Sequence, residues 1–317
     1  MAHSITDVNG IKVGCAEDLD ALTGCTVVLT GKEGAVCGVD VRGGAPGTRE
    51  TNLLSPLCRI DRVHAVLLTG GSAFGLDAAG GVMDFLEERG IGHFVGPTVV
   101  PIVPAAVIYD LDVGDYKTRP DRKMGYLACQ NAQKNVKEGN YGAGAGATVG
   151  KIRGYEYCTK SGLGTWSITL ESGLAVGAVV AVNAFGDVIE PSTGRVIAGA
   201  RGDKGQFLGT FEVWKQKYTN MPLYDVTNTT VAVVACNAKL DKAQANKVAQ
   251  MAHNGLAKTI SPVHTMFDGD TVFALATGEI EADVNIVGFL AGEVLARAVI
   301  RAVLAAETVK GYRSVKD

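Results

Sequence analysis

The chain has 317 residues, of which 47% are hydrophobic and 20% charged, and its mean hydropathy is +0.16. This composition excludes a disordered chain and indicates a globular protein with a large core, here expected to be one domain over residues 1–317. A net charge of −3 without any basic block argues against nucleic acid as a partner.

The cysteines and the first residues of the chain favour a cytoplasmic protein. No C-x-x-C motif is present, and no histidine is spaced as a metal ligand with the seven scattered cysteines, at positions 15, 25, 37, 58, 129, 158 and 236. We therefore expect reduced thiols and no metal site. The first residues lack the pattern of a secretory signal. The apolar run 284–306 contains Glu293, Arg297 and Arg301, which favours a packed helix over a membrane span.

The first third of the chain predicts strands and one helix. Strands are expected at Gly10–Cys15, Cys25–Thr30, Ala35–Val41 and Val63–Thr69. A helix is expected at Ala73–Arg89 with Ser72 as its N-cap. Gly80 and Gly81 would weaken that helix, so we expect them where it packs closely against another element.

The rest of the chain mixes both kinds of element. Pro101 and Pro104 exclude a central strand within Val99–Leu111. Residues Ile189–Asn228 are expected to be mostly irregular. Helices are predicted at Met124–Lys137, Asp241–Lys258 and Ala282–Thr308, and strands at Thr165–Leu170, Leu174–Ala184 and Thr271–Ala276. The helices are long enough to cover two sheet faces, which indicates a mixed α/β (α+β) fold.

The junction at Asn228-Thr229 has two interpretations. A polar run meets the β-branched run Thr229–Ala235, so a turn followed by a buried strand explains it without any chemistry. Alternatively, cleavage after Asn228 would give Thr229 a free α-amine beside its hydroxyl. An α-amine has an unperturbed pKa of roughly 7.7–8.0, so it can serve as the base that activates this hydroxyl.

The glycine-rich segment Gly144–Lys151 is not a nucleotide-binding motif. A phosphate-binding loop would need glycine in place of Ala145 and serine or threonine in place of Ile152. The dinucleotide fingerprint fails at Val149. Lys151 is therefore either a solvated lysine after a turn or a cation held near a developing oxyanion.

Three further positions have both a structural and a catalytic interpretation. Asp268-Gly269-Asp270 is an acidic turn, or two carboxylates that orient an amine or hydroxyl; it lacks the later ligands of a calcium loop. Asn183 is a turn former or an amide donor to an oxyanion. Tyr109 is by default a core residue. No nucleophile elbow and no paired histidine support a standard triad.

Taken together, these segments resemble the L-aminopeptidase/D-esterase family of self-processing hydrolases. The resemblance covers nearly the whole chain in order, through residues 41–54, 68–76, 100–110, 144–151 and 228–235. Within that family, residues 249–257 and 262–277 are most similar to the nylon-oligomer (6-aminohexanoate-oligomer) hydrolases. The aminopeptidase branch tends to have a serine nucleophile and a Ser-Gly-Glu pair in place of Thr229 and Asp268-Gly-Asp270.

The resemblance implies an α-β-β-α sandwich like that of the N-terminal-nucleophile hydrolases. It implies cleavage between Asn228 and Thr229 into fragments 1–228 and 229–317, which stay together and assemble as a tetramer of such pairs. By position, Thr229 is then the nucleophile, Lys151 and Asn183 hold the oxyanion, Asp268 and Asp270 orient Thr229, and Tyr109 assists at the pocket. No cofactor or metal is implied.

Two rival interpretations stay open at this point. One keeps the chemistry and changes the amide substrate from 6-aminohexanoate oligomers to peptides or amino-acid amides. The other is an unprocessed, non-catalytic binding protein of the same fold, against which the presence of Thr229, Lys151 and both aspartates argues.

Overall fold

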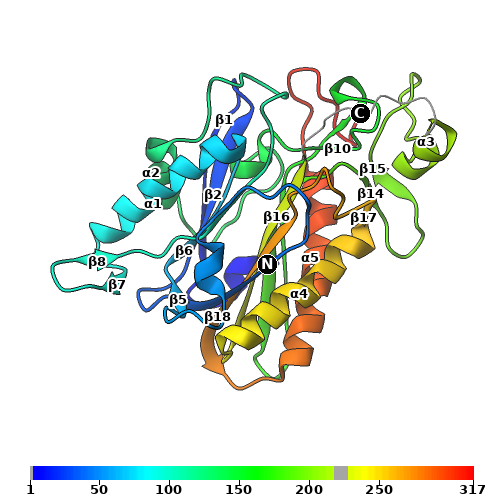
Figure 1. Cartoon of the computed structure of the whole chain (residues 1–317). Helices are drawn as coiled ribbons and strands as arrows, with labels where there is room; N and C mark the ends of the chain where they lie inside the picture. Colours follow the sequence, from blue (N-terminus) through cyan, green and yellow to red (C-terminus); the bar gives the residue numbers. More distant parts are fainter. Residues whose placement is uncertain (1–2, 218–227) are drawn as a thin grey trace.

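The computed structural model describes residues 3–217 and 228–317, and two β-sheets dominate it (Figure 1). The first sheet has the strand order β1-β2-β6-β9-β4. Its strands are β1 (Lys12–Asp18), β2 (Thr23–Leu29), β4 (Thr48–Arg49), β6 (Ala65–Thr69) and β9 (Ala105–Val107).

The second sheet contains the segment that begins at Thr229. Its strand order is β12-β13-β16-β18-β3-β5. These strands are β3 (Ala35–Val41), β5 (Arg62–Val63), β12 (Leu163–Thr169), β13 (Ala175–Asn183), β16 (Thr229–Ala238) and β18 (Thr271–Ile280). β16 runs parallel to β18 and antiparallel to β13, in the middle of the sheet.

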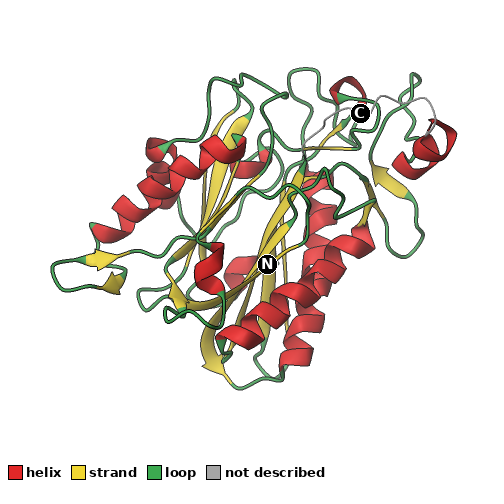
Figure 2. Cartoon of the chain, viewed as in Figure 1, coloured by secondary structure: helices red, strands yellow, loops and turns green. Residues whose placement is uncertain are grey.

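Helices cover the outer face of each sheet, which gives four layers (Figure 2). α1 (Ala78–Glu87) and α2 (Arg122–Gln130) cover the first sheet, and α4 (Lys242–Thr259) and α5 (Val284–Ala305) cover the second. Asp241, the first residue of the helix predicted here, accepts the Gln244 N–H and is the N-cap of α4. The remaining elements are short: β7 (His93–Phe94), β8 (Val99–Val100), β10 (Thr148–Val149), β11 (Thr159–Lys160), β14 (Asp187–Ile189), β15 (Val196–Ala198), α3 (Thr210–Lys217) and β17 (Ile260–Ser261).

Successive side chains of β16 point into two different cores. Val231 and Val233 lie in the core between the two sheets, together with Leu68 of the first sheet. Ala232 and Val234 point the other way, into the core under α4 and α5. Because both faces of the strand are buried, a continuous apolar run is required, as the sequence predicts. The predicted mixed α/β class and the α-β-β-α sandwich are confirmed.

The helix expected to start after Ser72 begins later than predicted. Residues Ser72–Asp77 form a 3-10 turn, and α1 starts only at Ala78. Ser72 has φ +52°, in the left-handed region, and its N–H donates to the Ile108 carbonyl. The end of β9 therefore holds this backbone outside the helical conformation, and Ser72 is not an N-cap.

Two further predictions about elements were wrong in part. β9 lies between β6 and β4, so Val99–Leu111 does contain a central strand. Pro101 and Pro104 precede its first residue, Ala105, and so remove none of its donors. α2 ends at Gln130 instead of Lys137 because Gln133 pairs with Val13 of β1.

The segment after Ile189 is more ordered than expected. It contains β15 and α3, and β14 pairs with both β15 and β17. Residues 218–227 lie outside the described part of the chain.

Gly81 allows α1 to approach α2. A Cβ added to Gly81 would lie 1.7 Å from the Arg122 carbonyl oxygen, whereas one added to Gly80 would first meet the end of the Arg122 side chain, at 3.1 Å. We expect Gly81→Ala to lower the free energy of unfolding by about 1–3 kcal/mol through overpacking. Gly80→Ala is the matched control and should be neutral or stabilising by up to about 1 kcal/mol. Urea unfolding of both variants measures this; equal losses would contradict the close packing at Gly81.

Candidate active site

Thr229 is the first residue of β16, and Asn183 is the last residue of β13. The two are direct partners across the antiparallel pair. Thr229 is 2% exposed and Asn183 fully buried, so the strand pairing fixes both inside the protein.

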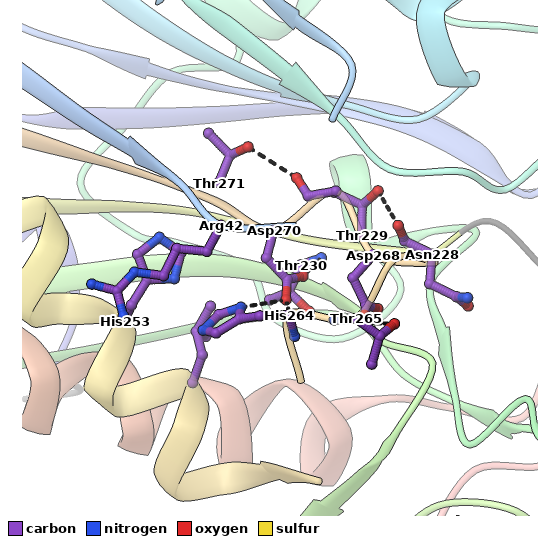
Figure 3. A network of polar contacts seen from close by, with 12 residues as sticks. Arg42, Asn228, Thr229, Thr230, His253, His264, Thr265, Asp268, Asp270 and Thr271 are labelled. Atoms are coloured by element: carbon purple, nitrogen blue, oxygen red, sulfur yellow. Dashed lines mark hydrogen bonds and ion pairs between the residues drawn. The ribbon is translucent and has the colours of Figure 1, made fainter. Parts of the chain in front are cut away.

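The peptide bond before Thr229 is held on both sides. The Asn228 N–H donates to the Phe267 carbonyl at 2.8 Å, and the Asn228 carbonyl accepts the Gly269 N–H at 2.9 Å. The Thr229 hydroxyl also donates to that carbonyl oxygen (Figure 3). The hydroxyl of Thr229 and a backbone donor therefore meet at the bond predicted to be cut.

Lys151 and Asn183 form one buried unit. Lys151 Nζ donates to Asn183 Oδ1 at 2.8 Å and to its carbonyl at 3.1 Å, and the Thr148 N–H also donates to Oδ1. Asn183 Nδ2 donates to the Tyr109 carbonyl at 2.8 Å. Burial lowers the pKa of Lys151 to about 7, because the charged ammonium loses its hydration.

A second buried lysine supports the loop that carries Lys151. Lys160 Nζ donates to the carbonyls of Gly144, Ala147 and Ser161 at 2.9, 3.1 and 2.5 Å. Three acceptors match the three protons of an ammonium group. Lys160 thus ties the glycine-rich segment to β11, and burial also lowers the pKa of Lys160 to about 7.

The two aspartates are held by different partners. Asp268 accepts the Thr265 N–H at 2.9 Å and the Thr265 hydroxyl at 2.6 Å, and its other oxygen faces the Phe185 N–H at 3.3 Å. Burial, followed by the charge of Asp270, raises the pKa of Asp268 above its ordinary value. Asp270 accepts the Thr230 N–H at 2.7 Å.

The structure brings most of the predicted site residues to the start of β16. Lys151 and Asn183 bond to each other, Asp270 bonds to Thr230, and Asp268 pairs with Asn228 as an isolated bridge. Tyr109 joins the cluster through its main-chain carbonyl. The catalytic roles given to these residues stay predictions.

Gly269 was not among the site residues predicted from the sequence. Its N–H donates to the Asn228 carbonyl, and a Cβ at this position would lie 2.7 Å from Thr229 Oγ1. The glycine is therefore required for the close approach of this backbone to the Thr229 hydroxyl. In the sequence, only the position of this glycine between two aspartates could have pointed to it, because any residue except proline can supply a backbone N–H donor.

A sandwich of two β-sheets, each covered by helices on its outer face, is the fold of the N-terminal-nucleophile hydrolases. Solved structures support this fold. The L-aminopeptidase D-Ala-esterase/amidase from Ochrobactrum anthropi, described as a variant of that hydrolase fold, has a TM-score of 0.73 at 19% identity and covers 96% of this chain and 86% of its own. A β-aminopeptidase from a Burkholderia species has a TM-score of 0.72 at 22% identity, covering 99% and 90%.

The chain belongs to peptidase family S58, whose model matches residues 3–316. An uncharacterized aminopeptidase of Mycobacterium leprae is 46% identical, covering 98% of this chain and 92% of its own. A 6-aminohexanoate-oligomer endohydrolase of Paenarthrobacter ureafaciens is 30% identical, covering 87% and 75%.

These relatives confirm the family resemblance stated above, and both of its branches occur among them. The protein is a hydrolase of amide or peptide bonds. Among its described residues, no helix is both long and apolar enough to cross a bilayer.

Proposed function

We propose that the chain cuts itself between Asn228 and Thr229 and then hydrolyses linear amides with Thr229 as an N-terminal nucleophile. The observation that carries this proposal is the Asn228 carbonyl, which meets the Thr229 hydroxyl and the Gly269 N–H in the uncut chain. A backbone N–H at 2.9 Å is well placed to stabilise the oxyanion that attack on this carbonyl creates.

Self-cleavage has two chemical steps. Thr229 Oγ1 attacks the Asn228 carbonyl carbon, the C–N bond breaks, and the nitrogen takes up a proton as the acyl group moves to the oxygen. Water then hydrolyses this ester, which leaves a carboxylate on Asn228 and a free hydroxyl and amine on Thr229. In the mature enzyme the amine is the base that activates the hydroxyl toward a substrate amide, and an acyl-enzyme forms and is hydrolysed.

The two fragments would remain together after cleavage. β16 and β18 belong to fragment 229–317, yet they pair with β13 and β3 of fragment 1–228 in one sheet. Separating them would break these ladders and expose the core on both faces of β16. We further propose a tetramer of such fragment pairs, which native mass measurement tests.

The acyl side of the site favours an α-aminoacyl group. In the uncut chain the Asn228 N–H is bound by the Phe267 carbonyl, so a nitrogen on the carbon next to the scissile carbonyl has an acceptor. A 6-aminohexanoyl unit has a methylene at that place. We therefore put amino-acid amides and short peptides first as substrates. Endo-type hydrolysis of 6-aminohexanoate oligomers is the second candidate, supported by the 30% identical endohydrolases.

An intact-mass spectrum of the purified protein, followed by two assays, tests this function. We expect two masses that correspond to a break after Asn228, and release of p-nitroaniline from L-aminoacyl anilides faster than hydrolysis of linear 6-aminohexanoate oligomers. The opposite order of rates would put the oligomers first. One uncut mass together with no hydrolysis would favour the non-catalytic binding protein.

A further inference from the structure

His264 lies in the loop between β17 and β18 and is directed at Asp270 (Figure 3). Two nitrogen atoms of this residue contact the same carboxylate oxygen: the backbone N–H donates to Asp270 Oδ2 at 3.1 Å, and the ring Nδ1 lies 2.8 Å from it. Nothing in the self-cleavage and hydrolysis steps above gives this histidine a role.

The other oxygen of Asp270 connects this contact to the nucleophile. Asp270 Oδ1 accepts the N–H of Thr230, the residue bonded to Thr229, at 2.7 Å. Asp270 is only 1% exposed, so these donors replace the water that a buried carboxylate loses. A continuous chain of contacts therefore runs from His264 through Asp270 to the backbone next to Thr229.

The backbone of His264 is adapted to this arrangement. Its φ of +57° lies in the left-handed region, which is uncommon for a residue with a side chain. The ring also packs edge-on against His253, with the ring centroids 4.8 Å apart. His253 is itself fixed, since its Nε2 lies 3.0 Å from the Asp40 carbonyl oxygen. The imidazole of His264 is thus held on one side by a ring and on the other by Asp270.

We propose that His264 is a positioning residue which, through Asp270, fixes the Thr229–Thr230 backbone for self-cleavage and for substrate hydrolysis. This inference rests on the proposed function. Nδ1 carries the proton in this arrangement, because a carboxylate oxygen accepts only from an N–H. Without that donor Asp270 keeps two backbone partners but is free to turn, and the scissile bond loses part of its alignment with the Thr229 hydroxyl.

Two variants at one position separate the hydrogen bond from the backbone conformation. Glycine and asparagine both tolerate a left-handed backbone, and both keep the main-chain N–H. Asparagine offers a side-chain N–H close to the place of Nδ1, whereas glycine offers none. We expect His264→Gly to slow self-cleavage by about 10- to 100-fold, as loss of a hydrogen bond to a charged group predicts, and His264→Asn to restore most of the rate.

The rate is measured by cell-free synthesis of the full chain followed by a timed intact-mass series. For the fragments that do form, kcat on an aminoacyl anilide should fall in His264→Gly with KM little changed. Urea unfolding of each variant in an uncut Thr229→Ala background verifies that the fold survives. Equal rates for the glycine and asparagine variants, whether fast or slow, would overturn the positioning role. Failure of the wild-type chain to cut would instead overturn the proposed function.

Discussion

Replacing Thr229 with alanine is expected to leave a single uncut chain of 33.0 kDa, whereas Thr229→Ser should still give two fragments. Alanine removes the hydroxyl that donates to the Asn228 carbonyl, while serine keeps a hydroxyl at this position. Loss of the nucleophile lowers the rates of comparable hydrolases by a factor on the order of 10⁶, so we expect no cleavage of Thr229→Ala within days. Intact-mass spectra of the three proteins measure this.

The alanine variant should keep its fold. Thr229 lies at the start of a strand whose core contacts come from Val231 and Val233, and removal of its hydroxyl and its methyl group costs about 1 kcal/mol each. Its circular dichroism spectrum should therefore match that of a folded α/β protein. If Thr229→Ala were still cut after Asn228, the attacking group would have to be another residue or water, and the N-terminal-nucleophile mechanism would be wrong.

The family resemblance predicted that Lys151, Asn183 and Thr229 belong to one site, and the strand patterns explain why the fold brings them together at the start of β16. Lys151, Asn183 and Thr229 are far apart in the chain, yet each stands at the end of a segment with a clear pattern. Asn183 ends an apolar run and Thr229 begins one, so antiparallel pairing of β13 and β16 places them face to face. Strand patterns of this kind depend on local sequence, and the folded protein forms both of these strands.

What could not be predicted depends on contacts between distant segments. The Gly269 N–H reaches the Asn228 carbonyl only because residues 228 and 268 pair as an isolated bridge. Ser72 leaves the helical conformation because the end of β9 binds its N–H. Nothing in the sequence marks His264, because its contact with Asp270 depends on the folded conformation of the loop that leads into β18. Backbone donors and loop conformations are decided by tertiary structure, which overrides local propensity.

Lys151→Met is expected to slow self-cleavage by about 10²–10³-fold, the loss typical for a donor that stabilises a developing oxyanion. Lys151 Nζ is fully buried and bonded to Asn183, the cross-strand partner of Thr229. Lys242→Met is the matched control. Its Nζ donates to three carbonyls, those of Leu53, Cys58 and Ile60, at 2.9, 2.9 and 2.7 Å, and none of these residues belongs to the candidate active site.

Both lysine variants should lose stability, and only one should lose cleavage. The carbonyls left by Lys242→Met belong to half-exposed residues and can bind water, so the loss of stability should be moderate and the timed intact-mass series should follow the wild type. Equal slowing of cleavage in both variants would mean that Lys151 acts through stability alone. It would then have no part in the chemistry at Thr229.

The pH dependence of stability gives an independent test of the environment of Lys151. Its pKa is about 7 in the folded chain, against roughly 10.4 for an unfolded lysine. Between these pH values the unfolded chain binds one more proton than the folded chain. The contribution of Lys151 to the free energy of unfolding is therefore largest above about pH 10 and is lost as the pH falls toward 7. Measured in the uncut Thr229→Ala background, the stability of the parent relative to Lys151→Met should rise by up to about 1.4 kcal/mol per pH unit in this window. Groups whose titration does not depend on Lys151, such as Lys160 and Cys25, cancel in this difference, whereas Cys158 does not, because burial raises the pKa of its thiol and the charge of Lys151 lowers it. A flat difference would mean that Lys151 keeps its ordinary pKa and is hydrated in the folded protein, which its burial beside Asn183 does not allow.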